Sequence, residues 1–83
     1  MEETDLVHSL VPAIMQQLDS PDTPFVKATY NRIIKLDDVD QDEAHKMLAL
    51  CLADESNRMF IDKRDFDIKR YKQLLDALPE LPE

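Results

Sequence analysis

The sequence predicts an all-α domain, a compact bundle of about four helices. Apolar residues recur at helical spacing in four separate stretches, and no stretch of useful length shows the two-residue alternation of a strand. The chain also has no glycine, so the positive φ angles of tight hairpin turns are hard to reach. Its 83 residues suffice for one small core. We therefore expect a single helical domain over residues 1–78, followed by a short Pro/Glu tail over residues 79–83.

The first helix is expected over approximately residues 5–19. Its apolar stripe consists of Leu6, Val7, Leu10, Val11, Ile14, Met15 and Leu18. Pro12 lies inside this stretch, and an interior proline removes a backbone hydrogen bond and clashes with the preceding turn. Because the stripe continues on both sides of Pro12, we favour one long helix with a bend. The alternative is a shorter helix that is capped by Ser9 and carries Pro12 in its first turn.

The second helix is expected over residues 24–36, after a segment dense in turn-forming residues. Thr23 followed by Pro24 is typical of an N-cap and a first helical position. The inner face would carry Val26, Tyr30, Ile33 and Ile34. The aspartates of residues 37–40 end this helix.

The third helix, over residues 41–60, has the clearest start signal in the chain. Asp40 and Glu43 form a capping-box pattern, in which the cap is followed three residues later by an acid. The helix is apolar over most of its circumference, through Ala44, Met47, Leu48, Ala49, Leu50, Cys51, Leu52 and Ala53. A helix of this kind is usually surrounded by others, so we expect it at the centre of the bundle.

The fourth helix is expected over residues 68–78. Asp67 is its predicted N-cap, and Phe66 and Tyr71 are spaced to form a hydrophobic staple around that cap. The stripe consists of Ile68, Tyr71, Leu74, Leu75 and Leu78. Pro79 then ends the helix.

Composition excludes several classes of function. The net charge of −8 disfavours direct binding to nucleic acid or to an anionic membrane. Without glycine there is no Gly-rich phosphate loop, and a single cysteine excludes a disulfide framework and any multi-Cys zinc site. No apolar run approaches the roughly 20 residues that span a bilayer. We expect a cytoplasmic protein whose partner is another protein.

Metal and catalytic sites are not expected. An EF-hand loop beginning at Asp38, Asp40 or Asp54 would lack the glycine and the glutamate that close such a loop. His8 and His45 have no second ligand four residues further on, and the single pair Asp42-x-x-His45 is not enough for a di-iron site, which needs two such pairs and two further acids. We therefore predict no catalytic residue, no metal and no cofactor.

Two polar positions stand out in the third helix. Cys51 lies in the most apolar run of the chain, so we expect a buried and unreactive thiol. Glu55 falls on the same stripe, one turn later, and two interpretations remain open. Either the helix emerges into solvent at this point, beside Asp54, Ser56 and Asn57, or Glu55 is a buried polar anchor that pairs with an Arg or Tyr of a neighbouring helix.

Charge is divided unevenly along the chain. Residues 1–57 carry four basic and twelve acidic side chains, whereas residues 58–83 carry six of each. The six bases and two aromatic residues between them form a candidate partner-binding cluster, which consists of Arg58, Phe60, Lys63, Arg64, Phe66, Lys69, Arg70 and Lys72. The alternative is that these bases merely balance nearby acids.

Several short motifs resemble a group of small all-helical bacterial proteins that have no known activity. The matching residues span approximately 24–79 and are Pro24-Phe25-Val26, Arg32, Asp42-Glu43-Ala44, Glu55, Phe66-Asp67, Tyr71 and Leu78-Pro79. Members of that group often have a glycine where this chain has Asp37-Asp38. The resemblance implies a helical bacterial domain and leaves its activity open.

We expect the protein to be a small non-enzymatic interaction module or accessory subunit. One alternative is an acidic regulator or mimic that acts on a nucleic-acid-binding protein, and a further one is a minor enzyme activity. The first alternative would need the surplus acids to gather on one face, and the second would need a pocket with convergent titratable groups.

Overall fold

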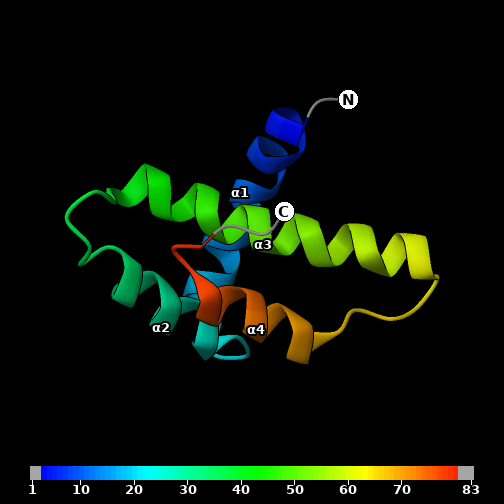
Figure 1. Ribbon diagram of the computed structural model, residues 1–83. Helices are drawn as coiled ribbons and strands as arrows, with labels where there is room; N and C mark the ends of the chain where they lie inside the picture. The colour runs from blue at the N-terminus through cyan, green and yellow to red at the C-terminus, as the bar shows by residue number, and fades with distance from the viewer. Residues whose placement is uncertain (1–2, 81–83) are drawn as a thin grey trace.

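The computed structural model describes residues 3–80, with side chains from residue 8 onward, and contains four helices in this range (Figure 1). They are α1 (Glu3–Asp19), α2 (Pro24–Ile33), α3 (Gln41–Asp62) and α4 (Ile68–Ala77). No strand occurs among the described residues. The predicted all-α bundle is therefore confirmed. The expected core side chains Leu6 and Val7 and the tail residues 81–83 lie outside the described part.

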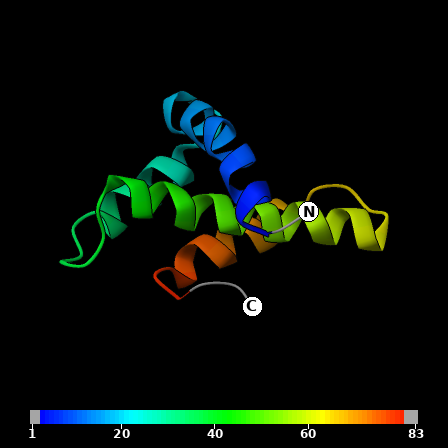
Figure 2. The same ribbon diagram turned by 90° about the horizontal axis from the view of Figure 1, so that it is seen from above.

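α3 is the central helix, as predicted. It packs against α1, α2 and α4, and Figures 1 and 2 show α1 crossing one side of it while α2 and α4 lie along another. The buried core draws on all four helices and consists of Ile14, Val26, Ile33, Ala44, Leu48, Ala49, Cys51, Leu52, Tyr71, Leu75 and Leu78. Because α3 is covered by three neighbours, its nearly all-round apolar surface is accounted for.

α1 runs through Pro12 as one helix, which is the longer of the two alternatives. Pro12 itself is exposed, whereas Ile14, two residues later, is fully buried. The apolar stripe on both sides of the proline therefore packs on α3 as one surface, and tertiary packing outweighs the lost backbone hydrogen bond.

Four helix boundaries differ from the expected ones: α1 begins two residues early, at Glu3, α4 ends one residue early, at Ala77, and the ends of α2 and α3 also differ. α2 ends at Ile33 rather than at residue 36, because the chain closes into tight turns in which the N–H of Leu36 donates to Ile33 and that of Val39 donates to Leu36. α3 continues two residues beyond the expected end. It stops where Lys63 adopts a left-handed conformation, with φ 54° and ψ 47°.

Thr23 occupies the expected N-cap position of α2 but does not cap it with its side chain. Its hydroxyl donates instead to the backbone carbonyl of Gln17 at 2.8 Å, near the end of α1. The predicted caps of the other two helices do form. Asp40 accepts from the N–H of Glu43 at 2.8 Å, and Asp67 accepts from that of Arg70 at 3.1 Å.

Tyr71 joins three helices at the core. Its ring meets the edges of Phe25 and Phe66 in T-shaped contacts, with centroid distances of 6.0 and 5.4 Å. Its hydroxyl donates to the side-chain oxygen of Gln17 on α1 at 2.8 Å. A buried tyrosine needs such a partner, so this hydrogen bond helps to set the position of α1 against α4.

Arg32 connects α2 to the C-terminal end of α4. Its guanidinium donates to the backbone carbonyls of Leu78 at 2.7 Å and of Leu75 at 2.9 Å. The last carbonyls of a helix lack partners within the helix and carry partial negative charge, so an arginine stabilises them both by hydrogen bonding and by charge. Residues 46 positions apart are thereby held together.

Candidate functional site

Glu55 lies on the buried face of α3 and has no exposed surface. One carboxylate oxygen accepts from Arg64 Nη1 and from the backbone N–H of Asp67, both at 2.7 Å. The other accepts from Arg64 Nη2 at 3.1 Å and from Arg70 Nη1 at 3.0 Å. Arg70 also pairs with Asp54, so the group of Asp54, Glu55, Arg64 and Arg70, here termed the Glu55 cluster, contains two acids and two bases. Of the two interpretations of Glu55, the buried anchor is the one that matches this geometry.

The hydrogen bond from Arg64 is the largest influence on the ionisation of Glu55. Together with the Asp67 N–H and Arg70, it outweighs the opposing effect of burial and lowers the pKa of Glu55 from its ordinary 4.5 to about 2. Glu55 is therefore ionised at every physiological pH. All four of its hydrogen bonds are charge-assisted, and such bonds are shorter and stronger than neutral ones.

The Glu55 cluster fixes the loop between α3 and α4. Arg64 reaches back to Glu55 from one end of this loop, while the N–H of Asp67 reaches it from the other. Arg64 Nη1 also donates to the carbonyl of Asp65 at 2.9 Å, within the loop itself. Although it contains no strand or helix, the loop is thus held in one conformation against α3.

At the C-terminal end of α3, just before this loop, the last turns of the helix extend past the other helices (Figures 1 and 2). The 22 residues of α3 make it more than twice as long as the ten-residue α4 that runs beside it. Phe60 follows Glu55 by five residues, which places it roughly 140° around the helix from that buried position. Phe60 is accordingly 82% exposed, and its neighbour Ile61 is 56% exposed.

The eight residues of the predicted partner-binding cluster separate into two groups. Five are exposed, namely Arg58, Phe60, Lys63, Lys69 and Lys72. The other three make internal contacts: Arg64 and Arg70 bind Glu55, and Phe66 packs on Tyr71. Lys72, although exposed, has its amine 4.8 Å from the centre of the Phe25 ring. The internal contacts leave Arg64 and Arg70 only 30% exposed, so they offer little to a partner.

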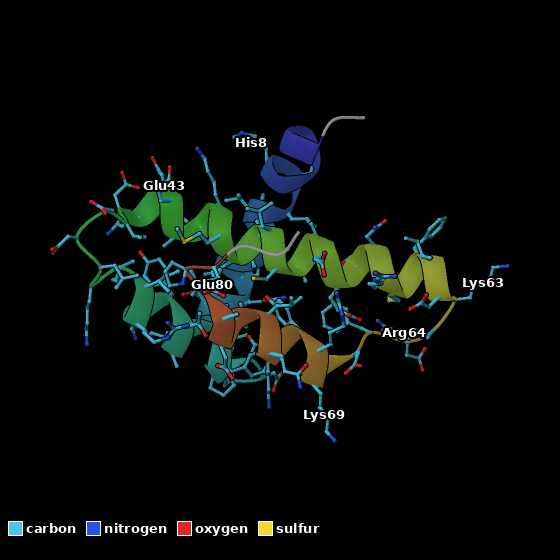
Figure 3. All side chains as sticks on the ribbon, viewed as in Figure 1. His8, Glu43, Lys63, Arg64, Lys69 and Glu80 are labelled. Atoms are coloured by element: carbon cyan, nitrogen blue, oxygen red, sulfur yellow. The ribbon has the colours of Figure 1, made fainter. Side chains whose placement is uncertain are left out.

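The exposed members do not all face one surface. Figure 3 shows Lys63 directed away from the molecule at the end of α3, whereas Lys69 projects from the start of α4 in another direction. We therefore define the α3 tip as Arg58, Phe60, Ile61 and Lys63, all of which are exposed. Ile61 was not among the expected residues, and its position next to Phe60, beyond the last core residue of the stripe, is the signal that could have identified it.

Two grooves flank α2. One has a volume of about 310 Å³, lies between α2 and α4, and is lined by Phe25, Ala28, Thr29, Arg32, Lys72, Leu75 and Asp76. The other, of about 460 Å³, is lined by Leu18, Asp19, Ser20, Pro21, Pro24, Lys27, Ala28 and Asn31. The first contains charged groups, but both terminal nitrogens of Arg32 are already bound to the carbonyls at the end of α4.

Cys51 and the two histidines are placed apart. The Cys51 thiol is buried, and this burial, with a smaller contribution from Asp54, raises its pKa to about 12, so it is not a nucleophile at neutral pH. His45 stacks on Tyr30 at a centroid distance of 5.4 Å, and His8 is exposed on α1. Across residues 8–80 no three His, Cys, Asp or Glu side chains are grouped as metal ligands would be.

None of the four helices is both long and apolar enough to cross a membrane.

No family model, curated protein or solved structure matches this chain. Its candidate site is therefore defined by geometry: an exposed aromatic and aliphatic pair at the end of α3, beside a loop that the Glu55 cluster holds in place.

Proposed function

We propose that this domain is a non-enzymatic protein-interaction module or accessory subunit, and that it binds its partner through the α3 tip. The observation that carries the proposal is the exposure of Phe60 and Ile61 side by side. Aromatic residues and arginine are enriched among the residues that dominate the free energy of protein association. Phe60 is one such residue, and Arg58 lies two positions earlier, roughly 160° around the same helix.

The surroundings of the tip support this proposal. A surface that is already ordered before binding loses less conformational entropy when it meets its partner. The α3 tip is part of a regular helix, and the loop that follows it is attached to Glu55 through Arg64 and Asp67. The tip can therefore present Phe60 without first having to be ordered.

An acidic regulator of a nucleic-acid-binding protein remains the second candidate. Exposed acids do gather at one end of the molecule, in the segment Asp37, Asp38, Asp40, Asp42 and Glu43. Asp40, however, caps α3, and Asp42 and Glu43 lie in its first turn, where negative charge stabilises the helix. Since helix stabilisation explains three of these five acids, we rank this function below the first. A cytoplasmic location is the further part of the proposal, and a free, buried Cys51 is compatible with that reducing compartment.

The proposal is tested by comparing three tagged proteins as baits in a cell lysate. The first is the unchanged chain, the second carries Phe60→Ser and Ile61→Ser, and the third carries Met15→Ser, which alters an apolar residue of α1 that is 53% exposed. We expect a protein partner to be captured by the first and third baits and lost with the second. Capture of the same proteins by all three folded baits would contradict a role for the α3 tip.

A further inference from the structure

Internal ion pairs determine which charged side chains at the α3 tip are free to meet a partner. Of the six bases between residues 58 and 72, Arg64 and Arg70 are bound to Glu55. Asp62, an exposed acid within the tip segment, lies 3.6 Å from Arg64 Nε, but Arg64 is shared between Asp62 and Glu55. Among the described side chains, Arg58 and Lys63 form no ion pair. The tip thus presents two positive charges outside any ion pair, Arg58 and Lys63, on either side of Phe60 and Ile61, and the partly paired Asp62 is the acid beside them.

The rest of the chain has the opposite charge. The protein carries a net charge of −8, and exposed acids gather around residues 37–43 at the N-terminal end of α3. Figure 3 shows Glu43 near one end of α3 and Lys63 at the other. A helix of 22 residues is about 33 Å long, several times the Debye length of about 8 Å at physiological salt. A ligand at the tip is therefore screened from the acids at residues 37–43, and the charges of the tip segment nearest to it are those of Arg58, Lys63 and Asp62.

These observations point to the chemistry of the partner. Building on the proposed function, we propose that the α3 tip binds an acidic protein segment that carries at least one large apolar side chain. The apolar side chain packs on Phe60 and Ile61, while carboxylates on either side of it face Arg58 and Lys63. An acidic segment is attracted to the tip and repelled by the rest of the molecule, so the charge pattern also selects the site and the orientation of encounter.

Other occupants fit these charges less well. A nucleic acid or an anionic membrane presents negative charge over an extended surface, and it would meet the acidic majority of the molecule as well as the tip. A second copy of this chain could offer its own acids at residues 37–43, but two molecules that each carry −8 repel each other overall. A short acidic segment of another protein avoids both penalties.

A library of displayed random short peptides, selected on the full-length folded protein, tests the inference. We expect the enriched peptides to be negatively charged and to contain Leu, Phe or Trp. Their affinity should fall roughly tenfold or more in Phe60→Ser, as for a central residue of an interface. In Lys63→Glu, the association rate should fall and lose its dependence on salt, whereas Lys46→Glu, which changes an exposed base at the other end of α3, serves as the matched control.

The possible failures are distinguishable. Enriched peptides that are neutral or basic but still need Phe60 would overturn the acidic partner and leave the proposed interaction function in place. Peptides that bind equally well to Phe60→Ser would overturn both, as would the enrichment of no peptide at all. Self-association of the protein in sedimentation, or capture of duplex DNA or phosphatidylserine vesicles, when lost in Phe60→Ser, would assign the tip to a different occupant and overturn the inference.

Discussion

Glu55 and Phe60 lie five residues apart on α3, and each has the solvent exposure that is unusual for its residue type. The carboxylate has no exposed surface, whereas the phenyl ring is 82% exposed. Burying a charge is unfavourable unless it is paired and hydrogen bonded, and exposing an aromatic ring forgoes the free energy of its burial. Glu55 meets the first condition through two arginines and one backbone N–H. Phe60 has no comparable compensation within the described part of the chain.

The comparison shows that the two positions serve different purposes. Glu55 replaces a hydrophobic contact with directional bonds that connect α3, the following loop and α4, and these bonds determine where the loop runs. Phe60 contributes nothing comparable to the core, because the helix has extended beyond its neighbours (Figure 1). The first residue is therefore explained by folding, whereas packing within the described part of the chain does not account for the second, which is the residue on which the proposed interaction rests.

The largest effect should come from Glu55→Gln. The substitution keeps the shape of the side chain but removes the charge that both arginines need, and its amide group turns a donor toward other donors. Breaking a buried pair typically costs 3–5 kcal/mol, and because both arginines keep contact with water we expect about 2–4 kcal/mol. Chemical denaturation would measure this change. An unchanged free energy of unfolding at neutral pH would return Glu55 to the role of a surface residue.

Acid should reproduce part of that effect in the unchanged protein. The folded-state pKa of Glu55, about 2, lies below its ordinary 4.5, so the stabilisation by the cluster is fully present above about pH 4.5 and is lost as the pH falls toward 2. Other carboxylates also titrate in this range, so the measurement is a difference. The gap in unfolding free energy between the unchanged protein and Glu55→Gln should narrow over this interval. A gap that stays constant from pH 6 to pH 2.5 would contradict the depressed pKa.

Cys51→Ser tests whether the same face of α3 tolerates a buried polar group that lacks a hydrogen-bond partner. Cys51 lies one turn before Glu55 and is equally buried, but no arginine reaches it. A hydroxyl there should destabilise the fold by about 1–3 kcal/mol, which thermal unfolding can measure. The native thiol should also react slowly with a bulky thiol reagent, and rapid labelling of the folded protein would show that Cys51 is accessible.

Phe60→Ser should have the smallest effect on stability. Most of the ring is already in water, so the free energy of unfolding should change by no more than about 0.5 kcal/mol. The measurement is the Tm of each variant, and we expect a much smaller decrease in Phe60→Ser than in Glu55→Gln. A loss of several kcal/mol in Phe60→Ser would mean that the ring packs within the fold, and the α3 tip would then lose its proposed role.

The resemblance to small helical bacterial proteins stays a prediction. Several of the residues that carry it have internal roles: Arg32 binds the end of α4, Glu55 holds the loop, and Tyr71 joins three helices. The exposed tip residues Phe60 and Lys63 are not among them. The motif residues with internal contacts are therefore explained by the packing of this chain itself.

Much of the fold could be predicted from the sequence because helix formation depends on local patterns. The apolar spacing predicted four helices, and the caps at Asp40 and Asp67 marked two starts, since a side chain and the N–H it caps are only three residues apart. The ends were less accurate. α2 ended early at Ile33 and α3 continued to Asp62, because turn geometry and the left-handed Lys63 decide these points.

The sequence by itself determined the all-α class, the central place of α3 and the uneven distribution of charge. Only the tertiary structure decided which of the clustered bases are free. Arg64 and Arg70 are separated from Glu55 by nine and fifteen residues, beyond the reach of any helical spacing rule, and their pairing depends on how the loop folds back on α3. The same holds for Phe60. Its exposure follows from the length by which α3 exceeds α4 and from the direction of packing, and these are properties of the assembled bundle that no local pattern contains.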